Sequence, residues 1–99
     1  MSMPRAMHSS KKCPIAKVAG LLSDSWTMLI IRDLLRSPAR FSELERSLSG
    51  VSSRTLTLKL KRLMDEGIAA KTGLLYSMTK PGERLGDVIA AMEKCGKGY

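Results

Sequence analysis

The side chains best suited to chemistry gather in the segment from Val51 to Gly67, which combines guanidinium, ammonium and hydroxyl groups. Arg54 carries a fork of donors that matches a guanine edge or a phosphate, and Thr57 and Lys61 follow it at helical spacing. Side chains at such spacings share one face of a helix. The segment therefore predicts a helix whose exposed face binds a polyanion through charge and hydrogen bonds.

Local signals mark both ends of this helix. Ser52 is a good N-cap, Val51 before it can staple onto Leu56, and Gly67 supplies a left-handed stop, so we expect a helix over about residues 52–66. Its apolar face consists of leucines at helical spacing: Leu56, Leu60 and Leu63. Taken alone, the segment is equally well interpreted as an ordinary amphipathic surface helix with solvated lysines.

The charge balance favours polyanionic partners. Seventeen Lys and Arg against nine Asp and Glu give a net charge of +8 over 99 residues, a length that suits one domain with one modest core. DNA, RNA or an anionic membrane surface would all qualify. No apolar run reaches the roughly 20 residues that a membrane span needs, and no secretory signal is recognisable. We therefore expect a cytoplasmic protein with a flexible basic leader over residues 1–12.

Catalytic and metal-binding patterns are missing from the sequence. The single histidine, His8, lies in the leader, and no nucleophile is coupled to a base by a known motif. Cys13 and Cys95 stand near opposite ends, and together with His8 they lack the paired short spacing of a metal site. We expect a binding protein with reduced thiols, no cofactor, no metal and no enzymatic activity.

The first half of the chain predicts three helices. The first begins at Pro14 and is short, and the second follows the polar cluster at residues 23–25 and ends before Ser37. Trp26 opens the apolar face of the second helix, where a lone aromatic is more typical of core packing than of a ligand site. Arg40 and Phe41 are expected to form a very short strand. A third helix over residues 43–48 follows, with Ser42 as its cap and inward-pointing residues Leu44 and Leu48.

The second half completes the arrangement. A turn over residues 49–52 separates the third and fourth helices by the spacing of a helix-turn-helix. Residues 68–71 and 74–79 are extended and should pair as a hairpin through a tight turn at Thr72 and Gly73. Thr79 caps a last helix over about residues 80–95, whose apolar stripe contains Leu85, Val88, Ile89 and Met92.

This order predicts a mainly α protein with a small β-hairpin. Three compact helices followed by a two-stranded hairpin form a winged helix-turn-helix, here with one helix added at each end, in a single domain over residues 13–99. An apolar helix left over at the C-terminus of so small a unit is more often a dimer element than a free surface helix.

An ordered series of short segments carries a resemblance to a known family. The segments are Cys13-Pro14, Trp26-Thr27, Ile31-Arg32-Asp33-Leu34-Leu35, Arg40-Phe41-Ser42-Glu43-Leu44 and Ser52-Ser53-Arg54 with Leu56-Thr57 and Leu60. Together, over about residues 13–96, they resemble the HxlR family of winged-helix transcriptional regulators. The resemblance implies a homodimeric DNA-binding regulator whose fourth helix enters the major groove. The twofold symmetry of such a dimer predicts sequence-specific binding to a palindromic or near-palindromic operator of duplex DNA. The resemblance also implies that the terminal helices form the dimer interface, with Ile15, Val18, Leu85, Val88, Ile89 and Met92.

Roles follow for the residues of the fourth helix. Arg54 is the best candidate for a guanine contact, with a phosphate clamp as an equal alternative. Ser53 and Thr57 are expected to bond base edges or phosphates, and Lys61 the DNA backbone. Arg62 flanks this face, and the free backbone N–H groups at Ser52 are expected to hold a phosphate. Further phosphate candidates, each of which could equally be a solvated charge, are Arg40, Lys71 and Lys80.

Two departures from the family limit what can be transferred. Leu58 stands where relatives tend to carry a polar residue, and it could touch a thymine methyl group or pack under the wing. The hairpin connection at Thr72 and Gly73 is shorter than usual in the family, so we expect the wing to contact phosphates only.

Cys13 allows two interpretations. It opens the first helix, where the helix dipole and the neighbouring Lys11 and Lys12 favour a thiolate, and some members of the family respond to oxidants or electrophiles through a cysteine in this region. The alternative is a small buried hydrophobe at the dimer seam. Two rival functions stay open as well: a winged-helix module that docks proteins or RNA without specific DNA binding, and a regulator with a small-molecule effector between the dimer halves.

Overall fold

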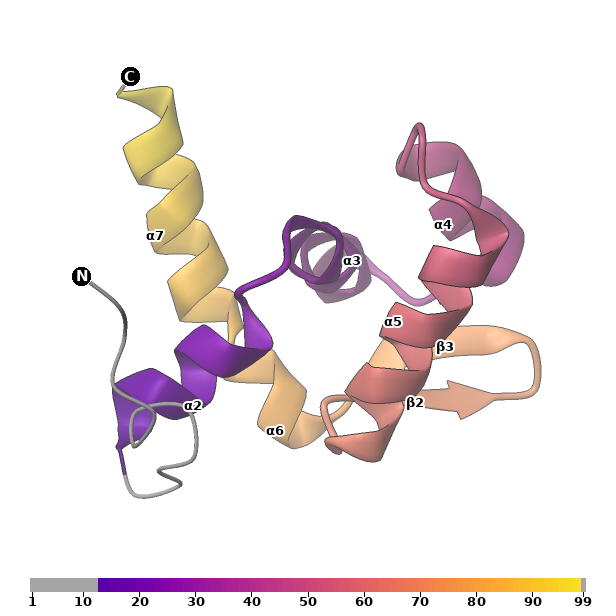
Figure 1. The fold of residues 1–99 in the computed structure, drawn as a ribbon, viewed down its shortest axis with the longest axis horizontal. Helices are drawn as coiled ribbons and strands as arrows, with labels where there is room; N and C mark the ends of the chain where they lie inside the picture. Colours follow the sequence, from indigo (N-terminus) through magenta and orange to yellow (C-terminus); the bar gives the residue numbers. More distant parts are fainter. Residues whose placement is uncertain (1–12, 99) are drawn as a thin grey trace.

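The computed structural model describes residues 13–98, so the predicted leader with His8 lies outside the described part of the chain. In chain order the elements are α2 (Pro14–Leu21), α3 (Ser25–Arg36), β1 (Ala39–Arg40), α4 (Phe41–Ser47), α5 (Ser53–Asp65), β2 (Ala69–Thr72), β3 (Leu75–Met78), α6 (Lys80–Glu83) and α7 (Gly86–Lys97). Figure 1 shows them with α3 at the centre.

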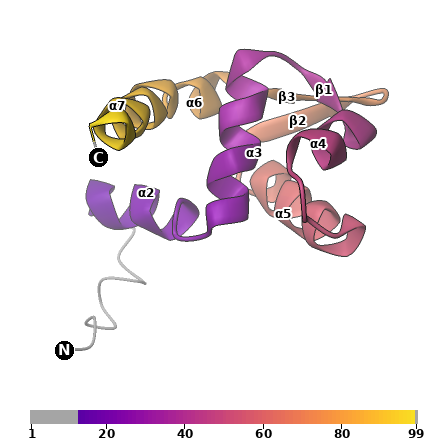
Figure 2. The same cartoon turned by 90° about the horizontal axis from the view of Figure 1, so that it is seen from above.

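Helix α3 separates the other elements into two groups. Figure 2 shows α2, α6 and α7 on one side of α3, and α4, α5 and the sheet on the other. The strands are antiparallel in the order β1-β3-β2, so β1 extends the hairpin to three strands. The mainly helical winged helix-turn-helix predicted from the sequence is confirmed, and the two terminal helices lie on the same side of α3.

One apolar core joins these elements. Trp26 packs against it while remaining half-buried, which agrees with its interpretation as a packing residue. Burial of each large aliphatic side chain contributes about 1.5–3 kcal/mol of transfer free energy. The core residues of α3, of α4 with the residue that follows it, and of α5 are Ile30, Ile31, Leu34, Leu44, Leu48, Leu56, Leu60 and Leu63.

The start of α4 differs from the prediction. Phe41 is the first residue of α4 rather than part of a strand, and Ser42 lies inside the helix rather than at its cap. The N-cap is Arg40, whose side chain has no acceptor for the free N–H groups of the first turn. Its own backbone N–H donates to Glu43 Oε1 at 2.7 Å, so a carboxylate reaching back from within the helix secures this end.

The hairpin turn lies one residue later than predicted. Thr72 pairs with Leu75 across the strands, so the turn consists of Gly73 and Leu74. Gly73 has a φ of 61°, a left-handed conformation that glycine adopts without the steric cost of a Cβ. The turn is nevertheless as short as expected, and Leu74 rather than a polar residue occupies its tip.

The predicted last helix is divided in two. Thr79 Oγ1 accepts the N–H of Gly82 at 3.1 Å and caps α6 as predicted. The N–H groups of Arg84 and Leu85 then bond to carbonyls three residues back, which tightens the turn and ends α6. Leu85 is thereby directed into the core of the chain, where it is 6% exposed. It is unavailable to a dimer partner, contrary to the prediction.

Candidate nucleic-acid interface

Helix α5 is held at both ends as its sequence predicts. Ser52 Oγ accepts the N–H of Thr55 at 3.0 Å, and Gly67 ends the helix with a φ of 74°. The inner face is completely enclosed, since its leucines are at most 1% exposed: Leu56, Leu60 and Leu63. The helix is therefore fixed to the domain along one face, and its opposite face points outward.

The outward face carries Arg54, Leu58 and Lys61, all of them exposed. Leu58 is 55% exposed, which rules out the alternative that it packs under the wing. No ion pair or side-chain hydrogen bond within residues 13–98 engages Arg54. Lys61 Nζ lies 3.1 Å from the carboxylate of Asp65, but an exposed pair of this kind is worth only about 0.3–0.5 kcal/mol and yields readily to a phosphate.

Hydroxyl groups secure the start of α5. Ser53 Oγ donates to Glu45 Oε2 at 2.5 Å and so joins α4 to α5 across the turn. Thr57 Oγ1 donates to the Ser53 carbonyl at 2.8 Å. These bonds occupy the hydroxyl protons but leave oxygen lone pairs, so without rotation Ser53 and Thr57 offer an outside partner chiefly hydrogen-bond acceptors.

A groove of about 460 Å³ lies between α5 and the wing, which consists of β2, β3 and the turn between them. It brings together three residues that the sequence suggested separately: Arg40, Thr57 and Lys71. Lys71 Nζ lies 5.3 Å from the ring centroid of Tyr76, the residue directly opposite it in the strand register. Arg40 and Lys71 both line this groove, and each could pair with a DNA phosphate.

Sequence reasoning missed four residues that complete the groove: Phe41, Ser42, Leu74 and Tyr76. Tyr76 was discoverable, because the correct hairpin register pairs it with Lys71. Leu74 could not be assigned to the groove from the sequence, because the turn was predicted one residue too early. It lines the groove at the tip of the wing and is 66% exposed.

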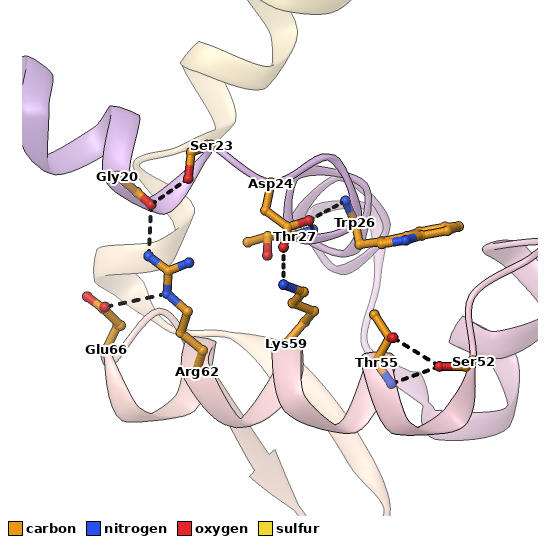
Figure 3. Close-up of polar contacts among 10 residues, drawn as sticks. All are labelled: Gly20, Ser23, Asp24, Trp26, Thr27, Ser52, Thr55, Lys59, Arg62 and Glu66. Atoms are coloured by element: carbon orange, nitrogen blue, oxygen red, sulfur yellow. Dashed lines mark hydrogen bonds and ion pairs between the residues drawn. The ribbon is translucent and has the colours of Figure 1, made fainter. Parts of the chain in front are cut away.

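Two predicted contacts lie away from this groove. Lys80 lines a separate shallow hollow with Pro81, Glu83 and Arg84. Arg62 points toward α2, where its Nη2 donates to the Gly20 carbonyl at 2.8 Å, and its Nε lies 3.8 Å from Glu66 Oε2. Arg62 is thus engaged beside the exposed face of α5 rather than on it (Figure 3).

The residues expected at a dimer interface are distributed unevenly. Ile15 on α2 is 73% exposed and Met92 on α7 is 45% exposed. Val18, Val88 and Ile89 are half-buried, and Val18 and Ile89 also pack against the core. Without Leu85, the exposed apolar side chains of Ile15 and Met92 still remain on α2 and α7, two helices that lie on the same side of α3.

Metal-binding and membrane-spanning features are few in the described residues. Among residues 13–98, no three His, Cys, Asp or Glu side chains come together so that they could hold a metal ion. Cys13 is a half-buried thiol and Cys95 an exposed one. No single described helix has the length and apolar composition to cross a membrane, although α2 and α3 meet that test as a pair bent by 93°.

Asp24 links the start of α3 to α5. Its Oδ1 accepts the N–H of Trp26 at 2.8 Å, and its other oxygen forms an ion pair with Lys59. The hydrogen bond from Lys59, with help from the N–H groups of Thr27 and Trp26, lowers the pKa of Asp24 although burial opposes this.

The lowered pKa of Asp24 predicts a pH-dependent stability. The ionised carboxylate stabilises the folded state above its ordinary pKa of about 4, and this contribution is lost as the pH falls through the lowered value. We expect Asp24→Asn to melt at a lower temperature than the wild type at pH 7, and the difference to shrink as the pH falls below about 4. Thermal unfolding followed by circular dichroism measures the melting temperatures of the wild type and the variant at each pH. A difference that is constant with pH would contradict the lowered pKa of Asp24.

Comparisons with known proteins agree with this geometry. Residues 21–99 match the protein-family model described as HxlR-like helix-turn-helix. The chain is similar to sll1512 of Synechocystis sp., with 34% identity over 94 residues that cover 88% of this chain and 70% of that protein. It is 33% identical over 96 residues to YvaP of Bacillus subtilis, with 89% of each chain covered. Both are described as uncharacterized HTH-type transcriptional regulators.

A solved structure gives the same result. The quinone-bound form of YodB from B. subtilis superposes with a TM-score of 0.80 at 28% identity, over 88% of this chain and 100% of that one. The matched family consists of transcriptional regulators and not of enzymes. The chain therefore belongs to the HxlR-like helix-turn-helix family of transcriptional regulators.

Proposed function

We propose that the chain binds duplex operator DNA sequence-specifically as a homodimer, with α5 in the major groove. The observation that carries the proposal is the division of α5 into an enclosed face and an open one, on which Arg54, Leu58 and Lys61 are exposed. Reading base edges requires a rigidly held helix with free donors and apolar groups on its outer side. The net charge of +8 supports a polyanionic partner.

Each exposed residue of α5 has a role in this proposal. Arg54 stands in the first turn, the part that helix-turn-helix proteins present to the bases, and makes a bidentate contact to guanine. Leu58 lies one turn later and contacts a thymine methyl group. Lys61 is further along the same face and contacts a phosphate.

The groove beside the wing holds the DNA backbone. Arg40 on β1 and Lys71 on β2 flank it, and Thr57 on α5 forms part of its wall. A phosphate between these residues would fix the register of α5 relative to the duplex without selecting a sequence. The wing ends in a turn of only two residues, so its contribution stays at the backbone.

Selection of bound duplexes from a random pool tests the function directly. We expect the enriched sequences to have two related half-sites whose centres are about 10 base pairs, or roughly 34 Å, apart. Affinity for the selected operator should fall steeply with added salt, because each neutralised phosphate releases counterions. A pool that does not enrich, or an affinity that is independent of salt, would instead favour a protein-interaction module.

The homodimer is proposed from the apolar face of the terminal helices. Ile15 on α2 is open to solvent, and Val88, Ile89 and Met92 form the stripe of α7. A single α5 reads only a few base pairs, too few to distinguish one operator among the many competing sites of a genome. Twofold pairing through α2 and α7 would supply the second recognition helix.

A second proposed function is the sensing of oxidants or electrophiles through Cys13. This residue is the N-cap of α2, where its half-buried Sγ accepts the N–H of Ala16 at 3.4 Å. The 28% identical YodB has been solved with a quinone bound, which supports electrophiles as the class of signal. A modified thiol could no longer cap α2 in this way, and α2 also carries part of the proposed dimer face.

The sensing function predicts a change in DNA binding on treatment. We expect mild peroxide or a simple benzoquinone to lower the operator affinity of the wild type several-fold, and Cys13→Ser to be insensitive because serine keeps a capping oxygen but cannot be alkylated at sulfur. Cys95→Ser is the matched control and should respond like the wild type. Unchanged affinity of the treated wild type would leave Cys13 as a packing residue.

A further inference from the structure

One edge of α5 belongs neither to its buried face nor to its exposed one. Thr55, Lys59, Arg62 and Glu66 recur along this edge at helical spacing. Figure 3 shows all four on the side of α5 that faces α2 and the start of α3. The two basic members of this stripe, Lys59 and Arg62, both reach across to the α2–α3 junction.

Lys59 meets a carboxylate that is already fixed. Asp24 accepts the N–H groups of Trp26 at 2.8 Å and Thr27 at 3.4 Å as the N-cap of α3, and its second oxygen pairs with Lys59. The two charged side chains are only 30% and 21% exposed, so their pairing is screened less than that of a surface pair.

Arg62 meets the end of α2. Its Nη2 donates to the carbonyl of Gly20, which also accepts the Ser23 hydroxyl at 3.2 Å. Gly20 lies in the last turn of α2, where carbonyls lack helical partners and the helix dipole is negative. A guanidinium is therefore well matched to this site, and Glu66 at 3.8 Å holds it from the other side.

We propose that Lys59 and Arg62 are positioning residues, which fasten α5 to Asp24 at the start of α3 and to Gly20 at the end of α2, and so make the orientation of α5 on DNA depend on the α2–α3 junction. We call Lys59, Arg62, Asp24 and Gly20 together the α5 clasp. The proposal rests on the proposed DNA-binding function and reassigns Arg62, which the sequence suggested as a DNA contact. It also gives α2, the helix with Cys13 and Ile15, a direct route to the recognition helix.

Replacement of Asp24, the acidic partner of Lys59, distinguishes a positioning role from the effect of net charge on DNA affinity. Asp24→Asn keeps a capping oxygen for α3 but removes the charge that holds Lys59. By charge alone, a chain more basic than +8 should bind DNA more tightly. The clasp predicts the opposite for the selected operator: Asp24→Asn should lower the affinity roughly three- to thirtyfold, while the affinity for random duplex stays unchanged or rises.

Removal of Arg62 separates positioning from phosphate contact. We expect Arg62→Gln to lower operator affinity by a similar factor while the slope of log affinity against log salt stays that of the wild type. Lys61→Gln is the matched control on the exposed face one residue earlier, and it should weaken operator and random duplex alike and reduce the slope by about 1. The double variant Lys59→Met with Asp24→Asn should lose no more operator affinity than the weaker-binding of the two single variants. Each single substitution already removes the same ion pair.

Several results would overturn the proposal. Operator affinity of Asp24→Asn equal to or above that of the wild type would show that the Lys59 pair does not position α5. Arg62→Gln with a reduced salt slope and equal losses on both duplexes would make Arg62 a phosphate contact. All titrations are made at a temperature where melting curves show each variant folded, since a merely structural role would lower the melting temperature and leave the ratio of specific to random binding unchanged. A wild type that enriches no operator would contradict the DNA-binding function itself.

Discussion

Arg54→Ala is expected to weaken binding to the selected operator by about 1–3 kcal/mol and binding to random duplex much less. Arg54 stands in the first turn of α5, is exposed, and has no ion pair within residues 13–98 to be broken first. Its guanidinium presents two donors in a planar fork that matches guanine O6 and N7 together. Titrations of wild type and variant against both duplexes measure the two losses.

Two control variants distinguish a base contact of Arg54 from a phosphate contact. Arg54→Lys keeps the charge but not the fork of donors, so random duplex should bind as before while the preference for one operator position is relaxed. Lys61→Ala should weaken all sequences alike. If Arg54→Ala lost equal affinity on operator and random duplex, Arg54 would be a phosphate clamp, and base reading would fall to Leu58 and the hydroxyls of α5.

Helix α5 could be predicted almost completely because its signals are local. Ser52 and Gly67 act on neighbouring N–H and carbonyl groups, and the three buried leucines recur within two turns. The helical periodicity of α3 and the hairpin follow from similarly short patterns. The order of these elements predicted the winged helix-turn-helix arrangement, and the resemblance to the family added the dimer and the docking of the fourth helix.

The errors arose where a local signal competed with another. Ser42 is a good capping residue, yet α4 begins earlier because Glu43 reaches back to Arg40 and Phe41 lies half-buried against the core. The stripe of the last helix looked continuous, but Leu85 is drawn into the core by a tightened turn that ends α6. Helical periodicity alone does not show which apolar side chain of a stripe will be buried in the core.

Partners distant in the sequence account for the remaining differences. Arg62 and Gly20 are 42 positions apart, and no pattern in the sequence pairs an arginine with one particular carbonyl. Lys59 and Asp24 are a similar case, since either charge could have been solvated. The groove gathers Arg40, Thr57 and Lys71 from β1, α5 and β2, and therefore exists only when the wing is folded onto α5.

The second large effect is expected at the dimer face. Ile15→Glu and Met92→Glu each place a carboxylate where the side chain is exposed in the single chain, so the fold should lose little stability. In an apolar interface the same carboxylate has no partner and opposes association. We expect sedimentation to show dimer for the wild type at micromolar concentration and monomer for both variants. Operator affinity should fall by on the order of 10²- to 10⁴-fold as the second half-site is lost.

Ala90→Glu is the matched control for this experiment. Ala90 is exposed on α7, but it lies about 200° around the helix from Met92 and therefore off the apolar stripe. This variant should remain dimeric and bind the operator like the wild type. Dissociation by Ile15→Glu alone would restrict the interface to α2. A wild type that sediments only as a monomer would remove the dimer from the proposal, and selection should then return single half-sites without a fixed spacing, because each α5 would bind independently.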